Sequence, residues 1–281
     1  MNYLNQIERI KSKLVQAKIT DKTFKVFGSN THKYILNKPV RNDEVTSFEK
    51  KYAIQLPECY KSFILNIGNG GASFSNSGAG PFFGIYSFGD HLDNLIYDSP
   101  EKYLSNKCIL KPNLTDDDWS EITKKLDDDT TSSEDFDIEL GKIYSGVLPL
   151  GSQGCTYIHG LVLNSDYKGR VVNVDINFNK PSFAFEDNFL DWYERWLDEI
   201  ISEELMDKNY NWFGYTMRGE EMELVKLFQS TDNIQTKKDV LIAIQTKKEI
   251  SSETLKFVEN EYSSTDESLK IELQQIIAKF T

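Results

Sequence analysis

The chain of 281 residues is 39% hydrophobic and 12% aromatic, which is enough apolar material for a folded core and argues against a disordered chain. Its net charge of −12 argues against binding to nucleic acid through a basic surface. The first residues lack the apolar segment of a signal peptide, and no run approaches about 18 apolar residues, so we expect a cytoplasmic protein without a membrane span.

Neither a metal site nor a catalytic centre is predicted. Cys59, Cys108 and Cys155 are far apart and odd in number, which is typical of buried free thiols rather than of disulfides or a zinc site. Residues 164–175 have part of the spacing of a calcium loop, but Lys168 occupies a position that needs an oxygen ligand. With three histidines and no recognised nucleophile motif, we expect no cofactor and no enzymatic activity.

The first seventy residues predict three helices and one strand. Apolar residues recur at spacings of three and four in residues 3–19, which predicts an N-terminal helix. The run Tyr34-Ile35-Leu36 predicts a strand. Two amphipathic helices are expected between Arg41 and Gly71, separated by Leu56-Pro57. Pro57 suits the first turn of the second helix, and Gly70-Gly71 suits a left-handed cap at its end.

Short elements follow these helices. Residues 68–80 are rich in glycine and serine and are expected to form a loop. The aromatic run from Phe82 to Phe88 predicts a short strand, and Pro100 opens a helical turn predicted at 100–107.

The segment near residues 113–140 carries most of the negative charge. Eleven acidic residues stand against Lys124 and Lys125 between Asp116 and Glu139, so this stretch contributes −9 of the −12. Its apolar residues are spaced for one short helix, whose first turn favours acids. We interpret the segment as an insertion that is either a solvated loop or a surface for a basic partner. The acids predicted to contact such a partner are Asp116, Asp117, Asp118, Asp127, Asp128 and Asp129.

A hairpin and a helix are predicted after the acidic segment. Residues 157–163 and 170–176 are rich in strand-forming residues and are separated by a turn containing Gly169, which predicts an antiparallel pair. Strand alternation puts Tyr157 and His159 on one face, which is either ordinary core or part of a partner-binding surface. An amphipathic helix is then expected from Phe189 to Ile200, capped by Asp187 or Asn188.

The last part of the chain has fewer aromatic residues and a helical pattern, which predicts three or four short helices. We therefore expect two domains. Residues 1–215 form an α+β domain that contains the acidic insertion, and residues 216–281 form a helical C-terminal extension.

The order of helix, Leu-Pro, helix and Asn-Gly-Gly resembles the SUKH superfamily, named for the yeast Smi and Knr cell-wall synthesis regulators. The resemblance spans roughly residues 40–205, with a closing aromatic helix after the hairpin. It implies a curved, mainly antiparallel sheet flanked by helices, followed here by an all-α extension that the family pattern does not cover. The matching positions are caps, turns and core residues: Leu56, Pro57, Tyr60, Phe63, Asn69, Gly70, Gly71, Gly151, Gly154, Trp192 and Trp196.

The resemblance also implies a function. Many bacterial members are immunity proteins, so the expected partner is a cognate protein toxin, for example a nuclease, whose active site this chain occludes. A non-catalytic intracellular signalling or regulatory scaffold of the Smi/Knr type stays open as the alternative. Neither a membrane nor direct contact with nucleic acid is expected, and the oligomeric state is left open.

Overall fold

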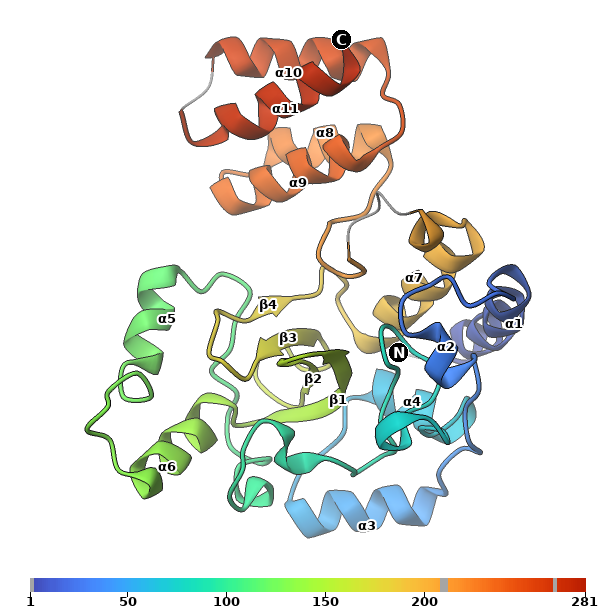
Figure 1. Ribbon diagram of the computed structural model, residues 1–281, viewed down its shortest axis with the longest axis vertical. Coiled ribbons are helices and arrows are strands. Elements are labelled where there is room, and N and C mark those ends of the chain that lie inside the picture. The colour runs from blue at the N-terminus through green and yellow to red at the C-terminus, as the bar shows by residue number, and fades with distance from the viewer. Residues whose placement is uncertain (1–2, 208–211, 265–266) are drawn as a thin grey trace. The chain divides into compact units, whose positions relative to one another are not determined.

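The computed structural model describes residues 3–207, 212–264 and 267–281, and the chain divides into two compact units (Figure 1). The first unit spans Met1–Lys208 and contains helices together with a sheet. The second unit spans Asn209–Thr281 and is helical. The α+β class with a helical C-terminal region, as predicted from the sequence, is confirmed.

Seven α-helices are present among the described residues of the first unit, and three single 3-10 turns precede the acidic segment. The prediction of an N-terminal helix is confirmed, and so is the closing aromatic helix. Asn188 caps that last helix, because its side chain accepts hydrogen bonds from the backbone of Leu190 and Asp191. The helices are α1 (Leu4–Thr20), α2 (Ser29–His32), α3 (Asn42–Tyr52), α4 (Glu58–Asn66), α5 (Asp116–Thr123), α6 (Ser133–Ile143) and α7 (Phe189–Ile201).

The sheet has four antiparallel strands in the order β1-β2-β3-β4. Strands β2 and β3 form the predicted hairpin, in which Ile158 lies opposite Val174. The first strand contains register shifts on both sides of Gly151, and such shifts bend a strand. The strands are β1 (Val147–Gly154), β2 (Tyr157–Val162), β3 (Val171–Asp175) and β4 (Ser182–Phe183).

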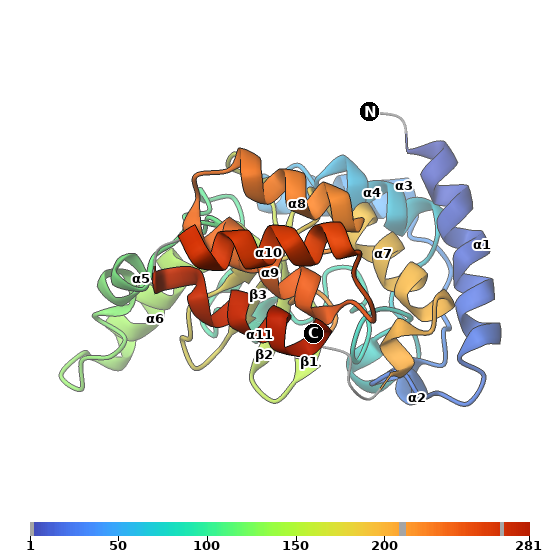
Figure 2. The same cartoon turned by 90° about the horizontal axis from the view of Figure 1, so that it is seen from above.

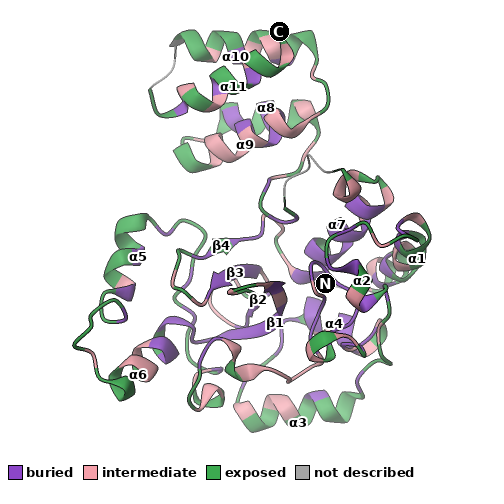
Figure 3. Ribbon diagram, in the orientation of Figure 1, coloured by how far each residue is buried: buried purple, intermediate pink, exposed green. Residues whose placement is uncertain are grey.

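Both faces of the sheet are buried, as Figure 3 shows for β1, β2 and β3. One face contributes Val147, Ile158 and Val172 to a core that also contains side chains of α5 and α6. On the other face His159 contacts Trp192 of α7, with ring centroids 5.0 Å apart. The sheet is therefore enclosed between α7 on one side and the acidic segment on the other.

Two predicted strands are absent. Residues 34–36 follow a turn after α2, and Tyr34 has a φ of 58°, which an extended strand does not allow. Between Phe82 and Phe88 a single bridge of Ile85 with Gly78 forms, and both Phe82 and Gly84 have a positive φ, which interrupts an extended strand. In both places aromatic composition suggested a strand. The side chains of Tyr34 and Phe82 are indeed buried, but the backbone that carries them is irregular.

The turns around α4 differ in detail from the prediction. Pro57 is the residue that precedes α4, one position earlier than expected. The helix ends at Asn66, and Gly70 lies beyond its cap with a φ of 52°. The carbonyl of Gly70 accepts a hydrogen bond from the backbone of Asn37, so this glycine shapes a return turn rather than the helix end. The predicted turn at Pro100 is present as a 3-10 turn, Pro100–Lys102.

The second unit contains four α-helices among its described residues: α8 (Glu221–Ser230), α9 (Ile234–Thr246), α10 (Ser252–Ser264) and α11 (Lys270–Phe280). Its own core includes Leu224, Phe228, Leu241, Ile244 and Leu273. Among the described residues of both units, no helix combines the length and the hydropathy that crossing a bilayer requires.

Candidate functional site

The acidic segment folds into two helices, α5 and α6, joined by a turn (Figure 1). One helix was expected, and the second begins where Ser132 supplies a cap: its hydroxyl accepts a hydrogen bond from the backbone of Asp135 at 3.1 Å. Thr115 and Asp118 form a reciprocal capping box at the start of α5. Serine and threonine in this segment therefore begin helices, although they are poor formers of helix interiors.

Buried apolar side chains attach this pair of helices to the sheet. Trp119, Leu126, Leu140 and Ile143 belong to the core beneath the sheet, and each is at most 9% exposed. The indole Nε1 of Trp119 also donates a hydrogen bond to the carbonyl of Phe178 at 2.7 Å. The interpretation as a solvated loop is therefore wrong, because the segment is a packed part of the first unit.

All six predicted partner-binding acids lie on the surface of this helical pair. The first three are in the first turn of α5, where the helix dipole favours negative charge. The other three are in the turn between α5 and α6. The six exposed acids are Asp116, Asp117, Asp118, Asp127, Asp128 and Asp129.

Four of these acids have partners inside the chain. Asp116 forms an ion pair with Lys180 at 2.5 Å, and Asp127 accepts a hydrogen bond from the hydroxyl of Thr123 at 3.2 Å. Hydrogen bonds from the backbone and side chain of Thr115 lower the pKa of Asp118. Asp128 has a lowered pKa as well, because the hydroxyl and the backbone of Thr130 donate to it. These contacts restrict the positions of the four carboxylates.

The side chains of Asp117, Asp129 and Glu134 are exposed and form no hydrogen bond or ion pair with any residue that the structure describes. They are the carboxylates of the helical pair that are most available to an outside partner. We define the acidic surface as the six predicted aspartates together with Glu134.

A hollow of about 390 Å³ opens beside α5. It is lined by the apolar residues Ile109, Leu114 and Ile122 and by the charged residues Lys111, Asp118 and Glu121. Ile109 is 44% exposed, so apolar surface is accessible directly next to carboxylates. This combination suits a side chain with an apolar stem and a cationic end.

The two residues of the second predicted contact region, Tyr157 and His159, differ in exposure. Tyr157 is 38% exposed at the start of β2, whereas His159 is 1% exposed. The Nδ1 atom of His159 lies 3.1 Å from the amide of Gln153 and 3.0 Å from the amide oxygen of Asn173. Burial lowers the pKa of His159 to about 3, so the ring is neutral in the core. The prediction that His159 contacts a partner is therefore wrong, since strand alternation does not show which face is covered.

The positions that carry the family resemblance have structural roles. The amide oxygen of Asn69 accepts a hydrogen bond from the backbone of Phe88 at 2.6 Å. A Cβ at Gly151 would lie 2.1 Å from the carbonyl oxygen of Gly84, and Gly154 has a φ of 99°. The following residues are all buried: Leu56, Pro57, Tyr60, Phe63, Trp192 and Trp196.

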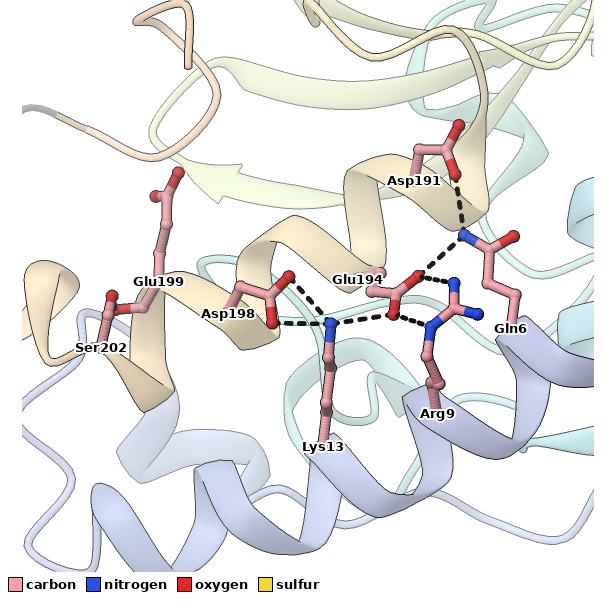
Figure 4. Close-up of polar contacts among 8 residues, drawn as sticks. All are labelled: Gln6, Arg9, Lys13, Asp191, Glu194, Asp198, Glu199 and Ser202. Carbon is pink, nitrogen blue, oxygen red and sulfur yellow. Dashed lines mark hydrogen bonds and ion pairs between the residues drawn. The ribbon is translucent and has the colours of Figure 1, made fainter. Parts of the chain in front are cut away.

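A polar cluster between α1 and α7 was not predicted (Figure 4). The carboxylate of Glu194 accepts hydrogen bonds from Gln6, Arg9 and Lys13, all on α1. Burial acts to raise the pKa of Glu194, but these hydrogen bonds outweigh it and lower the pKa to about 2. Lys13 also forms an ion pair with Asp198 at 2.7 Å. The charges of α1 gave no signal of this cluster because their partners lie more than 180 positions away in sequence.

The cysteines do not form a reactive or metal-binding cluster in the described part of the chain. Cys59 and Cys108 are buried free thiols, as predicted, but Cys155 is exposed. Residues 164–169 form the turn between β2 and β3, as the hairpin prediction requires. No group of three or more His, Cys, Asp or Glu side chains with the geometry of a metal site occurs among the described residues.

Comparison with known proteins identifies the family of the chain. No curated protein and no solved structure matches it significantly. A family model does match, over residues 39–195, which includes the sheet, the acidic helical pair and most of α7. Because that match covers more than half of the 281 residues, the chain belongs to the SMI1 / KNR4 family (SUKH-1).

Proposed function

We propose that this protein is an immunity protein that neutralises a cognate bacterial toxin by binding over the toxin's active site with its acidic surface. The observation that carries the proposal is the packed helical pair α5–α6, which presents Asp117, Asp129 and Glu134 without partners among the described residues. Proteins of the SUKH family are commonly immunity proteins against polymorphic toxins and are generally non-catalytic.

Rigid attachment favours this role for the acidic surface. The core contacts of Trp119 and Leu126 fix the helices before binding, so little conformational entropy is lost when a partner docks. A concentrated negative surface accelerates encounter with a basic protein, and this acceleration weakens with added salt. Nuclease toxins are suitable targets because their active sites hold phosphates with basic side chains.

The hollow beside α5 supplies a place for one anchoring side chain. An arginine or lysine of the toxin lays its aliphatic stem on Ile109 and Ile122 and directs its charge to Asp118 and Glu121. An anchoring side chain that is surrounded by charges slows dissociation of the toxin, whereas the exposed acids mainly set the association rate.

The test is a binding measurement with the toxin encoded beside this gene, or with a toxin captured from a strain that produces it. The triple variant D117K/D129K/E134K is compared with D93K/D166K/D187K, which makes the same change of net charge with exposed acids elsewhere in the first unit. We expect the first variant to lose about 100-fold in affinity, mostly through slower association, and the control to lose less than about threefold.

Equal losses in both variants would show that only net charge matters and would remove the acidic surface from the proposal. If no toxin binds and the wild-type chain gives no protection against toxin in growing cells, the immunity role itself is wrong. A non-catalytic regulatory scaffold is then the remaining candidate within the family.

A further inference from the structure

The N-terminal part of this acidic protein has the opposite charge. Residues 1–38 contain eight lysines and arginines against Glu8 and Asp21, so they carry +6 in a chain of net −12. The whole segment lies outside the residues that match the family. Asp21 is fully buried, where it accepts hydrogen bonds from the hydroxyls of Ser29 and Tyr34.

Basic and apolar side chains are exposed together in the last turns of α1 and in the loop that follows it. Arg9 and Lys13 are used by Glu194 on the side that faces α7. The opposite side carries Val15, Lys18 and Ile19, at the helical spacing that places them on one stripe, and Lys22 and Lys25 follow in the loop after the helix. We define the α1 surface as these five residues.

The α1 surface is unpaired within the described chain. Val15 is 61% exposed and Ile19 is 68% exposed, although the inner face of the same helix is closely packed. Lys18, Lys22 and Lys25 are exposed and form no ion pair with any described residue. Isolated exposed valine or isoleucine is common, but two of them one helical turn apart, next to three lysines without ion pairs in the described chain, form a surface with defined chemistry.

The α1 surface and the acidic surface lie at opposite ends of the first unit. Figures 1 and 2 both show α1 at one end and the α5–α6 pair at the other. The acidic surface also has apolar neighbours, since Ile109 and Ile122 line the hollow beside α5. The two surfaces therefore carry opposite charges, and each also exposes some apolar area.

We propose that the occupant of the α1 surface is the acidic surface of a second copy of this chain, so that the protein associates head to tail. Such a contact joins the α1 surface of one copy to the acidic surface of the next. Every complex therefore keeps one α1 surface and one acidic surface exposed, so the assembly grows with concentration instead of stopping at a dimer. At physiological ionic strength charges more than about 8 Å apart are screened, so the attraction between facing patches outweighs the repulsion between net charges. The association requires only these two surfaces and is independent of whether a toxin binds.

Sedimentation velocity of the full chain tests this association. In about 50–100 mM salt the wild-type protein is expected to sediment faster as its concentration rises to several hundred micromolar, and to return to monomer in about 500 mM salt. K18E/K22E/K25E and D117K/D129K/E134K should each remain monomeric, with at least a tenfold weaker association. K226E/K248E/K256E carries the same charge change as the first variant on exposed lysines of the second unit and should associate as the wild type does.

Mixing the two end variants makes the test specific. Neither variant can pair with itself. However, K18E/K22E/K25E keeps the acidic surface and D117K/D129K/E134K keeps the α1 surface, so an equimolar mixture of the two should associate again. Circular dichroism confirms that each variant is folded before mixing. A wild-type chain that stays monomeric at every concentration in low salt, or a mixture that sediments as two monomers, overturns the proposal.

Discussion

The guanidinium of Arg9 donates two hydrogen bonds to the carboxylate of Glu194, at 2.9 Å from Nε and 3.0 Å from Nη2. Arg9 lies on α1, outside the residues that match the family, whereas Glu194 lies on α7, inside them. Paired N–H groups that meet both carboxylate oxygens form the strongest type of ion pair in proteins. An N-terminal helix is thus fixed to the family fold by a contact of defined geometry (Figure 4).

Removing the charge of Glu194 should destabilise the first unit. We expect Glu194→Gln to lower the free energy of unfolding by about 1–3 kcal/mol at pH 7, because three donors from α1 lose their charged acceptor. The folded pKa of about 2 is below the ordinary value, so this stabilisation is present above about pH 4.5 and is lost as the pH falls toward 2. Urea unfolding of the wild type and the variant at pH 7, 4.5 and 3 measures both effects. Glu8→Gln removes an exposed pair with Lys11 and should cost less than about 0.5 kcal/mol.

Trp119 should control the order of the acidic surface. Its side chain is 5% exposed in the core below the sheet and its indole donates to Phe178. Trp119→Ala should cost about 3–5 kcal/mol and should raise amide hydrogen exchange in residues 113–140 more than in the sheet. Phe74→Ala, at a side chain 70% exposed, should change neither measurement. Uniform exchange across the first unit in Trp119→Ala would mean that the acidic helices do not unfold separately.

Two buried histidines should make the first unit sensitive to mild acid. Burial lowers the pKa of His159 to about 3 and that of His32 to about 4, so the unfolded chain binds protons more strongly than the folded one. Stability is therefore complete above about pH 6.5 and falls as the pH drops, by about 1 kcal/mol for each histidine between pH 7 and 5.5. Urea unfolding across this range measures the slope. His159→Gln should remove about half of it, and an unchanged slope would contradict the neutral, buried ring.

Close backbone approach should make Gly151 sensitive to substitution. A Cβ there would lie 2.1 Å from the carbonyl oxygen of Gly84, which cannot move as a side chain can. Gly151→Ala should therefore destabilise the first unit by about 2–3 kcal/mol in urea unfolding. Gly219→Ala is a matched control, because its nearest neighbour would be the flexible Leu224 side chain at 3.1 Å, and it should cost less than about 1 kcal/mol. Similar losses in the two variants would argue against the steric explanation.

Local patterns predicted the regular elements well where periodicity was strong. The helices at both ends of the first unit and the β2–β3 hairpin follow from apolar spacing and from the turn before Arg170. Predictions failed where composition was used without periodicity. Tyr34 and Phe82 are aromatic residues held in positive-φ turns, and their burial depends on neighbours that local sequence does not specify.

The candidate site was predicted in part. The acids of residues 113–140 are exposed as expected, because the cost of burying so many carboxylates excludes any other arrangement. The packing that fixes the helices carrying these acids was not predicted, because the indole of Trp119 bonds to Phe178, which lies 59 positions away in sequence. His159 illustrates the opposite error, because strand alternation gives two faces, and the face that holds this ring is covered by Phe82 and by Trp192 of α7, which are distant in sequence.

By itself the sequence determined the charge of each segment, the positions of most helices and the motif that connects the chain with its family, because these depend on residues close together in the chain. Tertiary structure alone decided which faces are buried, which carboxylates lack partners and where the two oppositely charged surfaces lie. Burial and ion pairing are contacts between distant segments, and only packing brings Arg9 to Glu194 or leaves Lys18 without a partner in the described chain.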